Sequence, residues 1–405
     1  MKRAIAVIDG EHYAPVVRAA LTELPYDFVA AVLLGGVEKL RGDDDYGVPL
    51  APDLVASLAY EPEIVIDLSD EPVLSPERRL LLASRSLALG LRYLGPDFDF
   101  DPPRYAPVGV PSLAVIGTGK RIGKTALTGQ LARLLARDRD VVVVAMGRGG
   151  PQEPELIAAA PTLEALLELS RSGRHAASDH LETAILAGVR TIGCWRCGGG
   201  LAGQVAASNV EAGARLAEEL APDVVIFDGS GAAIPPVDVD CRILVTGAEQ
   251  DVRAGLNAYR VLVSDLVVST GEGDGQYRAI REIKEVPVIR AKLRLVPVEP
   301  LGPGPVAVFT AGPAPISHLG ADVVATSANL ADRARLREDL ASIDAETFLI
   351  EIKAAAIDVV AEAACERGAR VVFARNDVVS LPGEPDLDAG LLALADTAMR
   401  DTVAA

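Results

Sequence analysis

The amino-acid sequence predicts an α/β protein built on parallel sheets, and two observations lead to this. Short apolar runs rich in Val, Ile and Ala alternate with stretches in which leucines recur at helical spacing. Repeated strand–helix units of this kind form parallel, doubly wound sheets. In addition, the glycine-rich stretch GTGKRIGKT (Gly117–Thr125) lies between an apolar run, Ser112–Ile116, and an amphipathic helix expected over Ala126–Ala136. This context predicts a phosphate-binding loop.

The glycine-rich loop carries the residue types that hold the phosphates of a nucleotide. Consecutive backbone N–H groups and the positive end of the following helix can surround phosphate oxygens. Gly123 lets the backbone come close, Lys124 would reach the terminal phosphates, and Thr125 would bind the Mg²⁺ that accompanies ATP. A glycine-rich turn without a ligand is the alternative. The predicted nucleotide-binding residues are Gly117, Thr118, Gly119, Lys120, Arg121, Ile122, Gly123, Lys124, Thr125 and Ala126.

The loop departs from the common pattern G-x-x-x-x-G-K-S/T at its first glycine. That pattern requires glycine at position 118, where this chain has Thr118, and the glycine stands one place earlier, at Gly117. The variant GT-x-x-x-x-GKT resembles the loop of dethiobiotin synthetase and its relatives, which mostly activate small molecules. We therefore expect a small-molecule-activating enzyme.

Charge and composition exclude several functions. The chain has 405 residues, 57 acidic against 39 basic, and a formal net charge of −18, so extended binding to nucleic acid or to an anionic membrane is not expected. No apolar run reaches the roughly 18 residues that cross a bilayer, and four cysteines do not form a disulfide framework. We expect a cytoplasmic homodimer. Lys120 and Lys124 are two of only seven lysines, so positive charge gathers at the loop.

The chain divides into three predicted parts. Residues 1–105 form an N-terminal Rossmann-like α/β domain, residues 106–300 form the parallel-sheet P-loop domain, and residues 301–405 form a C-terminal α/β lobe that could complete the P-loop domain. The Pro-rich stretches Gly95–Pro111 and Leu301–Pro305 mark the two boundaries.

The N-terminal part alternates strands with helices. Because ligands bind beyond the carboxyl ends of parallel strands, Asp9, Glu11 and His12 are candidate substrate contacts. The alternative is a turn with acidic residues that favour a helix N-terminus. The expected strands are Ala4–Ile8, Phe28–Leu34 and Ile64–Leu68, and helices are expected from about Pro15 and over Pro76–Leu89.

Two further strand ends in the P-loop domain carry candidate residues. Val141–Met146 leads to Arg148, which can fold over an oxyanion, and to Glu153, which could hold magnesium or its water. A flexible loop is the alternative. The strand within Asp223–Gly231 ends at Asp228, where P-loop enzymes place the carboxylate that orients magnesium.

The segment Gly188–Gly203 contains cysteines and arginines in a glycine-rich context. Cys194 and Cys197 have CxxC spacing, but without a second pair a metal site or a redox pair is not favoured. The arginines and glycines suggest an anion site instead, with Arg190, Arg196 and Gly199 as candidate substrate contacts.

The remaining patterns predict structural elements. Helices are expected over Thr162–Ser170 and Ser178–Ala187, the second capped by Ser178, with Asp179 and Glu182 as dipole partners and His175 and His180 as surface histidines. Further strands are expected at Arg242–Thr246, Asp265–Thr270, Val286–Arg290, Val306–Ala311, Asp322–Thr326, Thr347–Ile352 and Val371–Arg375.

Six stretches together resemble the family of cyclic 2,3-diphosphoglycerate synthetase. The resemblance runs through the whole chain and implies ATP-dependent closure of 2,3-diphosphoglycerate into a cyclic phosphoanhydride, with release of ADP and phosphate. The stretches are IDGEHY (Ile8–Tyr13), GTGKRIGKTA (Gly117–Ala126), MGRGGPQEPEL (Met146–Leu156), CGGGLAG (Cys197–Gly203), FDGSGAAIPP (Phe227–Pro236) and IEIKAAAIDVV (Ile350–Val360).

The implied chemistry gives the candidate residues their roles. Both steps bring an anion onto an anion, so catalysis must come from charge neutralisation and in-line positioning, and no dedicated base is needed. The expected cofactors are ATP and Mg²⁺, and the expected partner is a phosphorylated small molecule. The candidate catalytic residues are Lys124, Lys120, Arg148 and Arg196; the candidate metal ligands are Thr125, Asp228 and Glu153; and the candidate substrate contacts are Asp9, Glu11, His12, Arg148, Arg190, Arg196 and Gly199.

Two other functions remain open at this point. One is a dethiobiotin-synthetase-like ligase or small-molecule kinase that phosphorylates a carboxylate. The other is a nucleotide-switched, metal-delivery GTPase, although a guanine-reading N/T-K-x-D motif is not evident. The number of arginines around the site discriminates the first, because a diphosphorylated substrate needs more than one guanidinium beyond the P-loop.

Overall fold

The structure is a computed structural model that describes residues 1–42, 44–271, 273 and 275–404. Contacts between residues divide the chain into two units. The first contains Met1–Arg104 together with Asp251–Val263 and Arg278–Glu285, and the second contains Tyr105–Gln250, Ser264–Tyr277 and Val286–Ala405. The residues beyond position 300 therefore group with the P-loop strands in the second unit.

The first unit is built on a six-stranded sheet in the order β3-β2-β1-β4-β5-β6, parallel except for the last pair. β1 is almost entirely buried, as expected of a central parallel strand. The strands are β1 (Arg3–Ile8), β2 (Asp27–Leu33), β3 (Leu50–Ala51), β4 (Ile64–Asp67), β5 (Arg92–Leu94) and β6 (Asp99–Phe100). The helices of this unit are α1 (Ala14–Glu23), α2 (Leu54–Ser57), α3 (Pro76–Ala88) and α8 (Asn257–Leu262), with a 3₁₀ turn at Leu58–Tyr60.

The stretch Gly95–Pro111, predicted to mark a domain boundary, contains a strand. Its first part forms β6, which pairs with β5, and the two units divide at Arg104 and Tyr105. Phe98 lies just before β6 and stacks on the buried Tyr93, with ring centroids 5.5 Å apart. Aromatic burial therefore holds the start of this stretch in the first unit.

The second unit is built on a 13-stranded sheet, predominantly parallel, in the order β11-β10-β8-β12-β7-β13-β14-β15-β19-β18-β16-β17, with β9 paired to β10. The α/β fold class predicted from the sequence is confirmed. The strands are β7 (Ser112–Gly117), β8 (Val141–Gly147), β9 (Glu155–Ile157), β10 (Arg190–Cys197), β11 (Ala207–Ser208), β12 (Val224–Asp228), β13 (Cys241–Gly247), β14 (Leu266–Thr270), β15 (Val288–Pro297), β16 (Pro305–Phe309), β17 (Asp322–Ser327), β18 (Thr347–Glu351) and β19 (Arg370–Ser380).

Helices cover both faces of this sheet. α4 and α12 pack on one face over a core that includes Leu113, Leu127 and Val143. α7 packs on β8 and β10 from the other face, where Gly213 makes room for the Cys194 side chain. The helices are α4 (Lys124–Leu135), α5 (Leu163–Arg171), α6 (Asp179–Ala187), α7 (Val210–Glu219), α9 (Gly275–Ile283, whose later residues group with the first unit), α10 (Arg333–Ser342), α11 (Glu362–Glu366) and α12 (Leu387–Ala404), with a 3₁₀ turn at Ser317–Leu319 and a π-helical turn at Ala356–Ala361.

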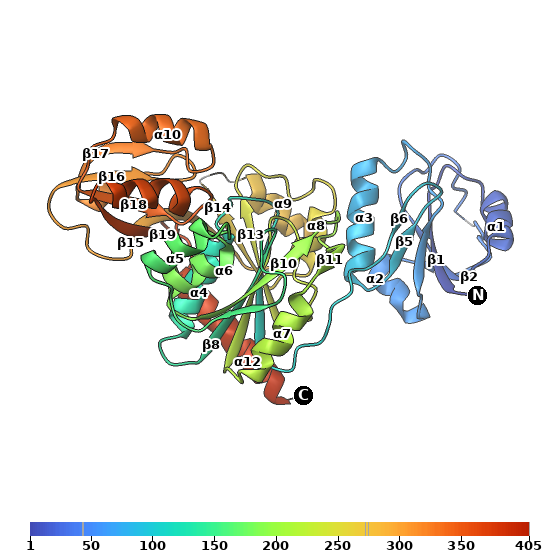
Figure 1. Ribbon diagram of the computed structural model, residues 1–405. Helices are drawn as coiled ribbons and strands as arrows, with labels where there is room; N and C mark the ends of the chain where they lie inside the picture. The colour runs from blue at the N-terminus through green and yellow to red at the C-terminus, as the bar shows by residue number, and fades with distance from the viewer. Residues whose placement is uncertain (43, 272, 274, 405) are drawn as a thin grey trace. The chain divides into compact units, whose positions relative to one another are not determined.

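The C-terminal strands continue the P-loop sheet rather than forming a sheet of their own. β19 pairs antiparallel with β15 through residues 374–380 and parallel with β18 through residues 370–374 (Figure 1). The P-loop helix α4 contacts β19 directly, because the Gln130 side chain donates to the Val378 carbonyl and accepts from the Val378 amide at 3.1 and 2.7 Å. In the described part of the chain, no helix is long and apolar enough to span a membrane.

Candidate functional site

The P-loop connects β7 to α4 with the predicted geometry. Gly123 has φ of +92°, in the left-handed region, and a Cβ on it would lie 3.0 Å from Leu293 Cδ2. The positive φ therefore favours glycine there, and a Cβ would also crowd the Leu293 side chain. α4 begins at Lys124, so its first amides face the loop as an anion-binding end requires.

The displaced first glycine has a steric reason. A Cβ on Gly117 would lie 2.6 Å from Lys124 Cδ, so the Lys124 side chain can cross the loop only because residue 117 is glycine. Thr118 instead turns its hydroxyl toward β13, where its Oγ1 lies 3.1 Å from Thr246 Oγ1 and donates to Gln250 Oε1. Glycine at position 117, in place of position 118, therefore leaves space for the Lys124 side chain to cross the loop.

Lys124 is the most buried cation of the loop. Its side chain folds back so that Nζ donates to the Gly119 carbonyl at 2.7 Å. Burial lowers the pKa of Lys124 to about 8, although Asp228 and Asp179 oppose the shift. The Gly119 carbonyl is its one hydrogen-bond partner among the described residues, and phosphate oxygens in the loop would accept from its other N–H groups.

Asp228 ends β12 beside β7, as expected for the strand-end carboxylate. Its side chain is 2% exposed, and its Oδ1 accepts from Thr128 Oγ1 of α4 at 3.1 Å. Burial, together with the negative charge of Asp179, raises the pKa of Asp228 to about 7 despite the attraction of Lys124. A cation next to this buried carboxylate would stabilise its ionised form.

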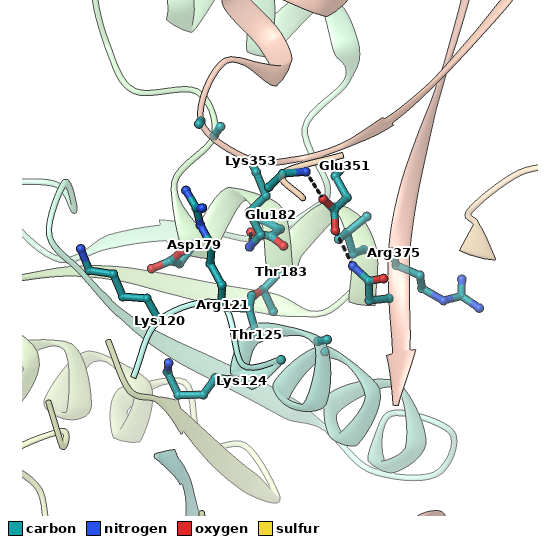
Figure 2. A pocket seen from close by; sticks show the side chains of 18 of the residues that line it. Lys120, Arg121, Lys124, Thr125, Asp179, Glu182, Thr183, Glu351, Lys353 and Arg375 are labelled. Carbon is teal, nitrogen blue, oxygen red and sulfur yellow. Dashed lines mark hydrogen bonds and ion pairs between the residues drawn. The ribbon is translucent and has the colours of Figure 1, made fainter. Parts of the chain in front are cut away.

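A cavity of about 550 Å³ lies between the P-loop and the C-terminal strands. Figure 2 shows Lys120, Arg121 and Lys124 on the P-loop side and Lys353 and Glu351 across from them. Its cationic lining residues outnumber its carboxylates. The cations are Lys120, Arg121, Lys124, Arg133, Arg148, Lys353 and Arg375, and the carboxylates are Asp179, Glu182 and Glu351.

Three predicted cations meet at one turn. A Cβ on Gly231 would lie 2.8 Å from Arg148 Nη2, 3.5 Å from Arg196 Nη2 and 3.9 Å from Lys120 Cγ. Lys120 and Arg148 line the cavity and make no hydrogen bond or ion pair within the described chain. Arg196 is instead held by the carbonyls of Gly198 and Ser230 at 2.8 and 2.9 Å. We therefore expect Arg196 to shape the turn while Arg148 stays available to a ligand.

Of the candidate catalytic, metal and substrate residues in the second unit, five are not among those that line the cavity: Arg190, Glu153, Gly199, Arg196 and Asp228. Arg190 begins β10, at the opposite end of the strand from the P-loop edge, and pairs with Asp140 at 2.6 Å. Glu153 and Gly199 are exposed and are not among the residues that line the cavity. Arg190 lies at the amino end of β10, away from the P-loop. The glycine-rich sequence that follows Arg190 did not reveal this position.

The CxxC spacing also receives a structural explanation. Cys194 is buried and Cys197 is exposed, because residues three apart on a strand point to opposite faces. Burial raises the pKa of Cys194 to about 12, which keeps it a thiol. Its role is to pack against α7.

The sequence interpretation missed the contribution of α6. Asp179 and Glu182 of α6, and the exposed His175 before this helix, line the cavity, and His180, expected on the surface, is 4% exposed. The N-cap position of Ser178 is confirmed, although its side chain makes no capping hydrogen bond. Glu182 forms an ion pair with Lys353 of the C-terminal lobe. The sequence offered one indication of this pair: in IEIKAAAIDVV (Ile350–Val360), Lys353 follows the end of a predicted strand.

Asp9, Glu11 and His12 lie in the first unit, at the carboxyl end of β1. Asp9 is fully buried and accepts from His12 Nδ1 at 2.8 Å and from the Glu11 and Asp70 amides at 3.0 and 2.8 Å. Burial raises its pKa, but these hydrogen bonds outweigh burial and lower it below its ordinary value. Asp9 therefore fixes this loop, and substrate contact by the three residues stays a prediction.

Comparison with known proteins decides the family. Three family models match along the chain: the cyclic 2,3-diphosphoglycerate synthetase N-terminal domain at residues 3–101, its P-loop domain at 112–292 and its C-terminal domain at 316–377. The cyclic 2,3-diphosphoglycerate synthetase of Rubrobacter xylanophilus is 48% identical and covers 98% of both chains. The chain belongs to the cyclic 2,3-diphosphoglycerate synthetase family.

Other relatives carry the same name. The cyclic 2,3-diphosphoglycerate synthetase of Thermococcus kodakarensis is 41% identical over 96% of this chain and 98% of its own, and that of Methanothermobacter thermautotrophicus is 38% identical over 98% and 97%. The solved LpxK from Aquifex aeolicus, in complex with ATP, aligns at a TM-score of 0.44 and 15% identity over 73% of this chain and 90% of that chain; a likeness this weak supports no inference. The family resemblance predicted from the motifs is confirmed.

Proposed function

We propose that this member of the cyclic 2,3-diphosphoglycerate synthetase family uses ATP to close 2,3-diphosphoglycerate into its cyclic phosphoanhydride, releasing ADP and phosphate. One observation carries the proposal beyond family membership. A chain of net charge −18 gathers seven cations around a single cavity at its P-loop, and Lys120, Arg121 and Arg148 among them have no ion-pair partner within the described chain. Two polyanions side by side require this excess of positive charge.

The P-loop side of the cavity suits ATP. Lys124, Lys120 and the amides at the start of α4 would bind its phosphates, and Thr125 lines the cavity next to them. The oxygens of Thr125 and Asp228 fit magnesium, which is commonly held by one or two protein oxygens together with phosphates. When bound, magnesium would neutralise charge on the ATP phosphates. The buried carboxylate of Asp228, whose pKa burial raises, is the group that such a cation would stabilise.

The proposed chemistry has two displacement steps. An oxygen of one substrate phosphate attacks the γ-phosphorus of ATP, ADP leaves, and a mixed anhydride forms. An oxygen of the neighbouring phosphate then attacks the activated phosphorus of the substrate, and the transferred group leaves as inorganic phosphate. Lys124, Lys120 and Arg148 would hold the approaching oxygens in line and screen their repulsion.

Phosphorus NMR tests the reaction directly. The purified protein is incubated with ATP, magnesium and 2,3-diphosphoglycerate, and the expected spectrum shows the cyclic product with equal amounts of ADP and phosphate. ATP consumption on another acid, without a cyclic product, would refute the proposal and favour a carboxylate-phosphorylating ligase. Consumption of GTP in place of ATP would favour the nucleotide-switched alternative.

We also propose that the protein works as a homodimer in the cytoplasm. Composition supports the compartment: the chain has few cysteines and no apolar run that could cross a bilayer. Light scattering coupled to size exclusion measures the mass, and a value near that of one 42.3 kDa chain would reject the dimer.

A further inference from the structure

Lys353 brings a cation from the C-terminal lobe into the P-loop cavity through an unusual turn. The turn follows β18. Ala354, the residue after Lys353, has φ of +42°, which a residue with a Cβ rarely adopts. Hydrogen bonds hold this conformation: the Ala355 amide donates to the Leu330 carbonyl at 3.2 Å, and the Ala356 amide donates to the Lys353 carbonyl at 2.8 Å. A π-helical turn begins directly afterwards. Strain of this kind persists where the surroundings impose it, and it gathers at functional sites.

One carboxylate aims the Lys353 side chain. Nζ pairs with Oε2 of Glu182, a buried residue on α6. Glu351 also faces the cavity, but its oxygens accept from the Ala311 amide at 2.7 Å and from the Asn376 side chain. Glu182 is therefore the side chain that fixes the direction of Lys353.

The ammonium of Lys353 keeps donors for a ligand. It has three N–H groups, and the Glu182 carboxylate is its one side-chain partner in the described chain. The Lys353 side chain is 36% exposed and lines the cavity, whereas the Glu182 side chain is 7% exposed. If the ion pair served only to stabilise the fold, the Lys353 ammonium would not need to remain exposed to the cavity.

The position of Lys353 favours the second substrate over ATP. The P-loop already supplies Lys120, Arg121 and Lys124 on its own side of the cavity. In Figure 2 Lys353 lies on the C-terminal lobe, across from Lys120 and Lys124, and the Arg121 side chain extends from the loop toward it. An acid that carries two phosphates and receives the phosphoryl group from ATP must reach the P-loop from that opposite side.

We propose that Lys353 binds a phosphate group of the diphosphorylated acid on the wall opposite the P-loop, and that Glu182 is its positioning residue. This inference rests on the proposed function. It extends the site from the P-loop domain into the C-terminal lobe, and it assigns the lobe the role of holding the acid.

Steady-state kinetics with matched variants test the assignment. Lys353→Met should raise the KM for 2,3-diphosphoglycerate about tenfold or more, as expected for loss of a charge-assisted contact, and change the KM for ATP less than about twofold. Lys353→Arg keeps the charge and should retain more affinity for the acid than Lys353→Met. Lys292→Met is the control, because Lys292 is exposed on β15 and is not among the cavity-lining residues; both of its KM values should match the wild type.

Removal of Lys353 leaves a buried carboxylate without its partner, so a folding defect must be distinguished from a binding defect. The double variant Lys353→Met with Glu182→Gln removes both charges, and its melting temperature reports whether the fold survives. The double variant should also show the raised KM for the acid. Glu182→Gln alone should also raise the KM for the acid, but less, because Lys353 keeps its charge and is no longer held in a fixed orientation.

The outcomes separate the two proposals. If the wild type forms no cyclic product, the proposed function fails; calorimetric titration of 2,3-diphosphoglycerate into the wild type and Lys353→Met then still reports whether Lys353 binds this acid. If the wild type forms the product and the folded double variant keeps the wild-type KM for the acid, Lys353 does not bind the acid. A loss of ATP affinity alone would move Lys353 to the nucleotide side and overturn the assignment.

Discussion

Nucleotide binding should be coupled to protonation of Lys124. In the structure, burial lowers the pKa of Lys124 to about 8, and its Nζ has the Gly119 carbonyl as its hydrogen-bond partner. Phosphates beside it would stabilise the ammonium and raise this pKa. About half of the Lys124 side chains are neutral at pH 8 and about a tenth at pH 7, so ADP binding should take up about 0.5 and 0.1 proton respectively.

The same linkage sets the pH dependence of affinity. If the loop binds phosphate with Lys124 protonated, neutralisation costs about 1.4 kcal/mol at pH 9, and the Kd for ADP should be about tenfold weaker there than at pH 7. Calorimetric titration of ADP in buffers with different ionisation enthalpies measures the proton count. The terminal phosphate of ADP, with a second pKa of about 6, is about a tenth protonated at pH 7 and about a hundredth at pH 8, so the uptake at pH 8 is the value that reports on Lys124.

Two variants make the measurement specific. Lys124→Met should abolish proton uptake near pH 8 and bind ADP weakly at every pH. Lys120→Met should bind more weakly but keep the uptake, because Lys124 is still present. Uptake that persists in Lys124→Met, or an ADP affinity that is constant from pH 7 to pH 9, would show that Lys124 does not contact the phosphates.

Three further predictions concern neighbouring groups. Burial raises the pKa values of Glu182 and Asp228 to about 7, so the folded state holds more protons than the unfolded state between about pH 4 and pH 7. The free energy of unfolding, measured by urea titration, should therefore fall as pH rises through this window. Glu182→Gln should make this fall smaller. Asp228→Asn should be at least as stable as the wild type at pH 8, since a buried charge is removed, while turnover with magnesium falls about a hundredfold or more; lower stability with normal turnover would contradict this. Gly231→Ala, at φ +63°, should lose about 1–2 kcal/mol of stability and raise the KM for the acid by displacing Arg148, and unchanged kinetics would place Arg148 away from the substrate.

The sequence predicted what local patterns encode. Runs such as VVVVAM give fully buried strands, and the glycine-rich loop gives the P-loop with Gly123 in the left-handed region. Asp228 was predicted at a strand end because an apolar run that ends in an acidic residue accompanies the GKT loop, and β12 does end at Asp228. These features depend on periodicity, glycine backbone freedom and strand ends, which a single sequence shows.

Features that depend on tertiary position were less accessible. Arg190 was assigned to the site from the glycines that follow it, yet it belongs to the amino end of β10 and pairs with Asp140. Glu182 was interpreted as a dipole partner of its helix, because the cation that pairs with it lies 171 residues later. A buried pair between distant segments leaves no local pattern, and only the fold reveals it.

The continuity of the second sheet explains how two opposite walls can act on one reaction. The P-loop helix is fixed to β19 through both hydrogen bonds of Gln130 with Val378 and through the 2.8 Å ion pair of Arg133 with Asp377. β19 pairs in parallel with β18, the strand that leads to Lys353. The same strands thus connect the lysine of the P-loop to the lysine of the C-terminal lobe. Since in-line transfer between two polyanions demands fixed spacing of the cations that hold them, a shared sheet provides that spacing before either substrate binds.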